Sequence, residues 1–309
     1  MNGNIKKMCN FAQNFMSKLI GLGLSVMILI SCGGKTSQQL EGENSTHEET
    51  KTISPRDKAK IEKMIYSIPS PVQAALLLEK TGARFDNKYM NDVSKVSSYQ
   101  TTPQIALNIG IYGADLAYTN VYKKHVEGLK YFSVIQKLGD KIGIGYIFTP
   151  ELMRRFEANQ NNQDSLISIT TDSFTEVHSH LKKNQQEELI ALMLVGGWIE
   201  ALYISCQIWE NNPNKAIATL IAEQKFSLND VMEVIRRSPK VPELDKIYKD
   251  LKELVAVFNQ VKATYSYEKT ELKKDRNLAV IENQTKLSYS NETIKKISKI
   301  ISKIRNSIN

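Results

Sequence analysis

The chain has 309 residues, with 41 lysines and arginines against 33 aspartates and glutamates, and a formal net charge of +8. Hydrophobic residues make up 41% and charged residues 24%, which is ordinary for a globular protein with a sizeable core. These values exclude three overall classes: a chain disordered throughout, a collagen-like fibre and a small disulfide-stapled protein.

The first 31 residues have the layout of a secretory signal. A basic segment with Lys6, Lys7 and Lys18 precedes an apolar run over residues 19–30. The run is shorter than the roughly 20 apolar residues of a comfortable membrane span. The translation start is open, because Met8 and Met16 also precede the run.

The end of this signal resembles the bacterial lipobox. Residues 29–33 read Leu-Ile-Ser-Cys-Gly, with a small residue, Ser31, before Cys32. The resemblance implies cleavage between Ser31 and Cys32, a diacylglycerol on the cysteine sulfur, and palmitate among the attached acyl chains. The alternative is an unmodified cysteine beside an ordinary signal. Lipidation would leave Cys206 as the single free thiol of the mature chain, so we expect no intramolecular disulfide.

Residues 32–54 are expected to form the lipidated cysteine and a flexible tether. Small and polar residues dominate the segment, which cannot bury enough apolar surface to become ordered. Its typical reach is about 25–30 Å. The sequence thus predicts a signal at 1–31, a tether at 32–54 and one helical domain at 55–309, with a possible sub-boundary near residue 240.

The predicted fold class is mostly α, an irregular multi-helix bundle. Six of the eight prolines follow a residue type that caps helices, which marks helix starts. Apolar spacing then predicts helices near 55–67, 71–81, 87–97, 103–121, 124–138, 150–158, 163–182, 185–210, 213–223, 227–237 and 242–264.

A β-hairpin over about 266–290 and a final amphipathic helix are expected at the C-terminus, since the apolar period changes after Tyr265. The final helix carries isoleucines on one stripe and Lys295, Lys296, Lys299, Lys303 and Arg305 elsewhere. Residues 240–309 hold 15 basic and 9 acidic side chains. This surplus suits either a solvated face or contact with an anionic membrane or acidic protein. Nucleic acid is not an expected partner of an exported chain.

Two polar stripes are the candidate ligand-binding residues. Residues 189–208 are almost wholly apolar, yet Glu200 stands in their middle, which favours a buried helix of a bundle over a membrane span. Gly196 and Gly197 predict the close approach of a neighbouring helix or ligand. The candidate residues on the two stripes are Asn108, Tyr112, Asp115, Glu200, Tyr203 and Gln207. They predict either a polar pocket with an acid/base pair or a satisfied structural network.

Other chemistry is weakly signalled. Asp172, Glu176 and His180 share a helical face, but no second Glu/His motif completes a metal site. The sequence has no nucleophile elbow, phosphate-binding glycine loop or zinc cysteine pair, so we expect no metal, cofactor or assigned catalytic residue. A serine triad of unfamiliar order stays open, because triads are made in space.

Three segments resemble a family of uncharacterised helical lipoproteins from Bacteroidota. They are residues 109–118 (IGIYGADLAY), 192–203 (LMLVGGWIEALY) and 299–308 (KIISKIRNSI). The resemblance spans most of the chain after the tether and implies an envelope with two membranes, but no activity. In that phylum, acidic residues directly after the cysteine direct some lipoproteins to the cell surface. Here the first acid is Glu41, which favours the periplasmic face of the outer membrane, with the cell surface as the alternative.

The leading hypothesis is therefore a lipid-anchored binding or scaffolding protein of the cell envelope with a protein partner. The alternatives are an envelope enzyme or small-ligand receptor built around Asp115 and Glu200, and a structural role for the isoleucine-rich last helix.

Overall fold

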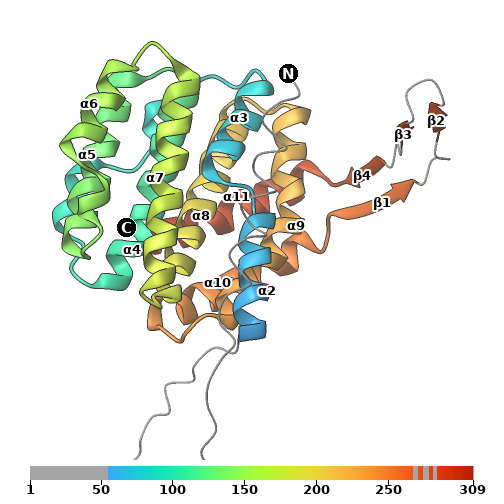
Figure 1. The fold of residues 1–309 in the computed structure, drawn as a ribbon. Helices are drawn as coiled ribbons and strands as arrows, with labels where there is room; N and C mark the ends of the chain where they lie inside the picture. Colours follow the sequence, from blue (N-terminus) through green and yellow to red (C-terminus); the bar gives the residue numbers. More distant parts are fainter. Residues whose placement is uncertain (1–54, 267–270, 274–277, 281–283, 309) are drawn as a thin grey trace, which may run out of the picture. The chain divides into compact units, whose positions relative to one another are not determined.

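A computed structural model of the chain describes residues 55–266, 271–273, 278–280 and 284–308 (Figure 1). The predictions of a signal, a lipobox and a tether lie outside the described residues. The described residues belong to one compact unit. Its helices and small C-terminal β-ribbon confirm the predicted mostly α fold class.

Ten α-helices lie within the described ranges. They are α2 (Pro55–Ser67), α3 (Pro71–Lys80), α4 (Thr102–Val121), α5 (His125–Lys141), α6 (Pro150–Ala158), α7 (Gln163–Lys183), α8 (Glu187–Asn211), α9 (Lys215–Arg237), α10 (Pro242–Phe258) and α11 (Asn291–Ile308). Three short 3-10 turns join them: η1 (Asn87–Tyr89), η2 (Val93–Ser97) and η3 (Gly145–Ile147).

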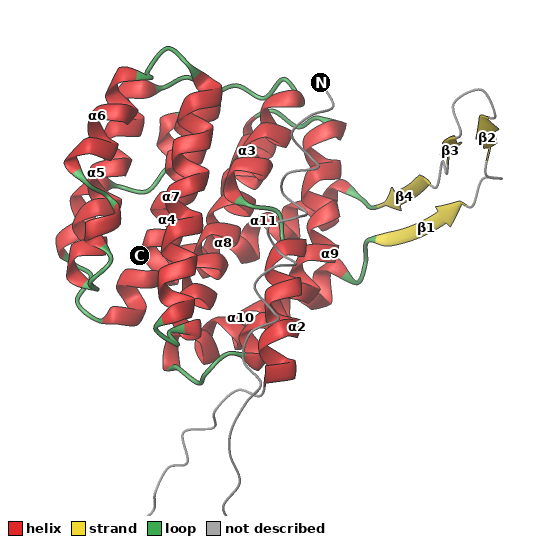
Figure 2. Ribbon diagram, viewed as in Figure 1, coloured by secondary structure: helices red, strands yellow, loops and turns green. Residues whose placement is uncertain are grey.

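Two helices form the centre of the fold. α4 packs along α8, and both are buried along most of their length. α3, α5 and α7 also pack on α4, while α9 and α11 pack on α8 (Figure 2). Of the helices in the described part, α8 alone is long and apolar enough to span a membrane, and 78% of its most apolar window is buried inside the protein. This burial agrees with its expected place at the core of a bundle.

Side-chain caps start several helices where the sequence predicted them. Ser70 accepts from the Gln73 backbone N–H, and the Gln73 side chain accepts from the Ser70 N–H, which forms a capping box before Pro71. Thr149 caps α6 in the same position relative to its proline. Ser238 is an exception, because it follows the end of α9 instead of starting a helix.

The prediction of one helix over 87–97 was wrong. The structure has the separate turns η1 and η2 there, capped by the side chains of Asp86 and Asp92. The backbone between them bonds to α4 and α5: the Tyr112 hydroxyl donates to the Asp92 carbonyl, and the Tyr131 hydroxyl donates to the Asn91 carbonyl. These tertiary bonds take up carbonyl groups that a continuous helix would use itself.

The two helices predicted over 213–223 and 227–237 are one helix, α9. The apparent break arose because polar Gln224 and Ser227 interrupt the apolar pattern. Both side chains bond to the indole N–H of Trp198, at 3.2 and 2.9 Å. Gln224 and Ser227 therefore have a hydrogen-bond partner on α8, which allows these polar side chains to face the core.

The helix predicted over 242–264 ends earlier, at Phe258. Val261 remains fully buried, and the chain then becomes strand β1 (Lys262–Ser266). β1 pairs antiparallel with β4 (Gln284–Ser288), and β2 (Glu271–Lys273) pairs with β3 (Leu278–Val280) further out. The ribbon confirms the predicted hairpin, which begins four residues earlier than expected.

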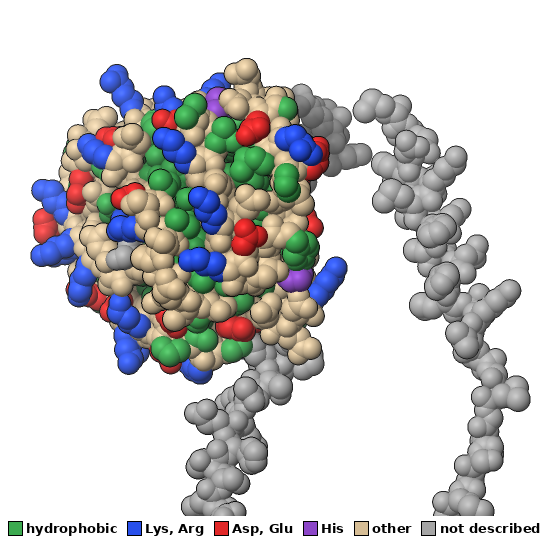
Figure 3. Space-filling view, turned by 90° about the vertical axis from the view of Figure 1, so that its left-hand side faces the viewer, with side chains coloured by type: hydrophobic (Ala, Val, Ile, Leu, Met, Phe, Trp, Pro, Cys, Tyr) green, Lys and Arg blue, Asp and Glu red, His purple; other side chains and the backbone are tan. Residues whose placement is uncertain are grey.

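The last helix packs its isoleucine stripe on the bundle and leaves its basic side of lysines in solvent, as expected for a solvated face. Ile294, Ile297, Ile301 and Ile304 are buried against the bundle, where α11 contacts α8, α9 and α10. Its lysines face solvent. Figure 3 shows another face of the protein, on which charges of both signs are scattered among polar groups and hydrophobic side chains occur in small groups.

Candidate functional site

Glycines let α4 and α8 approach each other backbone to backbone. A Cβ added to Gly110 would lie 1.9 Å from the Met193 carbonyl oxygen, and one added to Gly196 would lie 2.1 Å from the Leu107 carbonyl oxygen. Both distances are far below any real contact, so only glycine fits either position. The sequence predicted the approach of a neighbouring helix or a ligand, and the structure places a helix there.

Asp115 on α4 is fully buried. Its Oδ2 accepts a hydrogen bond from the Asn91 backbone N–H at 3.1 Å. Its Oδ1 is buried without a hydrogen-bond partner in the described part of the chain. The carboxyl group of Asp115 therefore has one donor where an ionised carboxylate needs several.

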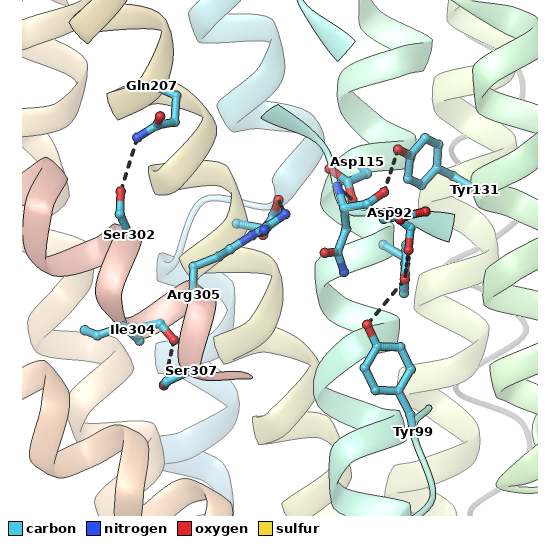
Figure 4. Close-up of polar contacts among 12 residues, drawn as sticks. Asp92, Tyr99, Asp115, Tyr131, Gln207, Ser302, Ile304, Arg305 and Ser307 are labelled. Atoms are coloured by element: carbon cyan, nitrogen blue, oxygen red, sulfur yellow. Dashed lines mark hydrogen bonds and ion pairs between the residues drawn. The ribbon is translucent and has the colours of Figure 1, made fainter. Parts of the chain in front are cut away.

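Glu200 on α8 is also fully buried, but it is paired. Arg305 of α11 donates two hydrogen bonds to it, from Nε to Oε2 at 3.0 Å and from the second guanidinium nitrogen to Oε1 at 3.1 Å. The guanidinium also lies over the Tyr203 ring, 4.7 Å from its centroid. Figure 4 shows Arg305 reaching from α11 between the helices in the direction of Asp115.

The ionisable groups of Asp115, Glu200 and Arg305 interact electrostatically. Burial raises the pKa of Asp115 well above its usual range, and the nearby charge of Glu200 raises it further. Burial also raises the pKa of Glu200, although Arg305 opposes this shift. Two ionised carboxylates and one guanidinium would leave a negative charge uncompensated in the core. We assign the extra proton to Asp115, because Glu200 holds both guanidinium bonds.

Tyrosine hydroxyls surround these groups and bond to the backbone of 91–92. Tyr112 donates to the Asp92 carbonyl at 2.8 Å, and Tyr131 donates to the Asn91 carbonyl at 2.9 Å (Figure 4). Tyr99 lies 3.3 Å from the Tyr112 hydroxyl oxygen. Burial raises the pKa of Tyr112 and of Tyr131, so these phenols stay neutral donors. They hold the η1–η2 segment against α4 and α5.

The six candidate ligand-binding residues do not line one pocket. Asn108 and Tyr112 are fully buried, and the Asn108 amide donates to the Gln104 carbonyl of its own helix. Asp115 and Glu200 are likewise sealed from solvent, which argues against the first alternative, a polar pocket around them. The arrangement is closer to the second alternative, a structural network of carboxylates and tyrosines, but the network is not fully satisfied, because Asp115 Oδ1 has no partner among the described residues.

Arg305 is the member of this network that sequence reasoning missed as a site residue. The available signal was its position: it follows Ile301 by four residues and therefore shares the buried face of α11. A lone carboxylate within the apolar helix α8 also required a cation from elsewhere in the fold. Only the packing of α11 on α8 shows that the two requirements meet.

The Asp172, Glu176 and His180 face carries no metal site. Asp172 accepts from the Ser168 hydroxyl, while His180 bonds to Tyr146 and Asn184. Among the residues that the structure describes, no group of three His, Cys, Asp or Glu side chains is placed to hold a metal ion.

An open groove lies where α8 ends beside the first turns of α11. Its cavity volume is about 580 Å³. Gln207 borders it and donates from Nε2 to the Ser302 hydroxyl at 3.1 Å (Figure 4). Among the six candidate residues, Gln207 borders this groove. Figure 4 shows Gln207 on one side of Arg305 and Asp115 on the other.

Comparisons with protein-family models, curated proteins and solved structures found no match to this chain.

Proposed function

We propose that the protein is a lipid-anchored binding or scaffolding protein of the cell envelope, similar to the helical lipoproteins of Bacteroidota. The observation that carries this proposal is the lipobox-like segment 29–33, placed directly after a signal-like apolar run and before a polar tether. Cys32 would carry the lipid. The expected location is the outer membrane, on its periplasmic face, with the cell surface as the alternative.

The burial of Asp115 and Glu200 bears on the alternative of an enzyme or receptor built around them. The two carboxylates that could act as an acid/base pair are inaccessible to a substrate, and Glu200 is already neutralised by Arg305. General acid/base catalysis needs such a group within hydrogen-bond reach of the reacting atom. An enzyme or receptor that uses Asp115 and Glu200 is therefore disfavoured.

The lipid anchor is tested by metabolic labelling of cells with radioactive palmitate. The natural chain should carry the label and fractionate with outer membranes, whereas Cys32→Ala should lose the label. Cys9→Ala is the matched control and should keep it, since Cys9 would leave with the signal. Label that persists in Cys32→Ala would overturn the anchor.

The partner is tested by photo-crosslinking from three exposed positions on different elements. Tyr66 on α2, Val126 on α5 and Tyr265 on β1 are each more than half exposed. A crosslinking amino acid at these sites should capture a defined envelope protein from at least one of them, identified by mass spectrometry. Failure at all three positions, with the variants folded and anchored, would argue against scaffolding.

A further inference from the structure

The groove between α8 and α11 is the cavity that Gln207 borders. It is lined by Gln207, Trp209, Glu210, Pro213, Lys295, Lys299 and Ser302. Its volume of about 580 Å³ lies within the range of small-molecule sites. Trp209 is 2% exposed and forms part of the inner wall, while the charged residues are exposed at the rim.

Two ammonium groups border this groove, and neither has a carboxylate partner in the described part of the chain. Lys295 and Lys299 are four residues apart on α11 and therefore share one face of the helix. Neither makes an ion pair within the described ranges, whereas Lys303, one turn further along, pairs with Glu253 at 3.3 Å. Lysine ammonium groups are common phosphate ligands because they act as compact positive charges.

The remaining polar groups add donors and acceptors. Ser302 accepts the Gln207 amide bond, so its hydroxyl proton is available to a ligand. Glu210 is an acceptor that would repel a bare anion but would bind a hydroxyl or an amine. The groove is therefore complementary to a molecule that carries both an anionic group and hydrogen-bond donors.

We propose that this groove binds a phosphate-bearing polar molecule with hydroxyl or amine groups. Lys295 and Lys299 hold the phosphate, and Glu210 accepts from the donors. The same chemistry occurs in a free phosphorylated metabolite and in a phospholipid headgroup. This inference deepens the proposed binding function and rests on it only for the presence of lipid nearby.

The first test measures which lysines a probe protects from acetylation. The full chain is acetylated in neutral detergent, with or without glycerol 3-phosphate, and in phosphatidylcholine vesicles, with or without phosphatidylglycerol. Mass spectrometry gives the rate at each lysine. Lys296, exposed on the same helix and outside the groove lining, is the internal control. Adding the probe should slow the acetylation of Lys295 and Lys299 more than that of Lys296.

The two arms distinguish the sources. Protection by free glycerol 3-phosphate assigns a soluble ligand, and protection only by phosphatidylglycerol assigns a headgroup. Protection by neither probe overturns the proposal, as does equal protection of Lys296, which would indicate diffuse attraction to the basic helix.

The second test measures affinity by titration calorimetry with whichever probe protects. The Lys295→Gln/Lys299→Gln variant should bind about tenfold or more weakly, since it loses both charge-assisted bonds. Lys249→Gln/Lys296→Gln removes the same charge from exposed sites outside the groove and should bind as the natural chain does. Equal weakening of both variants would overturn the site. Palmitate labelling and crosslinking do not depend on the groove, so the proposed function can survive its failure.

Discussion

Replacing Arg305 with methionine removes the cation from the core and leaves Glu200 stranded. The pair has two hydrogen bonds, and its carboxylate is 0% exposed, so solvent screens it little. Breaking a buried pair by removing one partner costs about 3–5 kcal/mol. Loss of the guanidinium stacked on Tyr203 adds about 0.5–1 kcal/mol. We therefore expect Arg305→Met to lose about 3.5–6 kcal/mol, a large fraction of a typical folding free energy of about 5–15 kcal/mol.

The loss should depend on pH with a defined sign. Without Arg305, burial raises the folded-state pKa of Glu200 further above its unfolded value of about 4.3. The folded state then binds more protons than the unfolded state, so stability falls as pH rises, by up to about 1.4 kcal/mol per unit. The deficit relative to the natural chain should be smallest near pH 4. Urea unfolding, followed by the fluorescence of Trp198 and Trp209, measures it.

Two further variants make this reasoning refutable. Glu200→Leu/Arg305→Met replaces the whole pair by apolar groups and should regain most of the lost stability. Lys303→Met breaks the exposed pair with Glu253 on the same helix and should cost no more than about 1 kcal/mol. If Arg305→Met costs no more than Lys303→Met, or if the double variant is no better than Arg305→Met alone, the pair is not what anchors α11.

Three other predictions concern the same core. Asp115 has a folded pKa above its unfolded value of about 3.9, so its contribution to stability should decline as pH rises above 4. The free energy of unfolding of Asp115→Asn should therefore rise relative to that of the natural chain between pH 4 and 7. A difference that does not depend on pH would refute the proton assigned to Asp115. Gly110→Ala should cost about 3 kcal/mol or more in urea unfolding, because its Cβ would overlap the Met193 carbonyl. Gly197→Ala, whose Cβ would lie 3.1 Å from a Pro71 side-chain carbon, should cost clearly less, and equal costs would contradict the close-packing argument. Deleting 291–309 should unfold the domain by circular dichroism, since α11 buries an isoleucine stripe; a folded truncated domain would favour a role for α11 in association instead.

Local signals predicted most of the helical fold. Periodic apolar residues and capping residues before prolines placed α3, α4, α6 and α7 to within a few residues, because these features act over one or two turns. The errors occurred where distant partners changed the local preference. The 87–97 segment does not form one helix, because its backbone bonds to α4 and α5. The sequence of α9 looked broken because Gln224 interrupts its apolar pattern, and the distant partner Trp198 satisfies that side chain in the fold.

The sequence by itself determined the helical class, the amphipathic last helix and the close approach at the glycines of α8, since periodicity and glycine content are local properties. It also singled out Asp115 and Glu200 as unusual. Only the tertiary structure decided that both carboxylates are sealed, that Arg305 neutralises Glu200, and that Lys295 and Lys299 border a groove with Gln207. Such pairings join residues up to about a hundred positions apart, and the chain order does not encode which buried charge meets which cation until the helices pack.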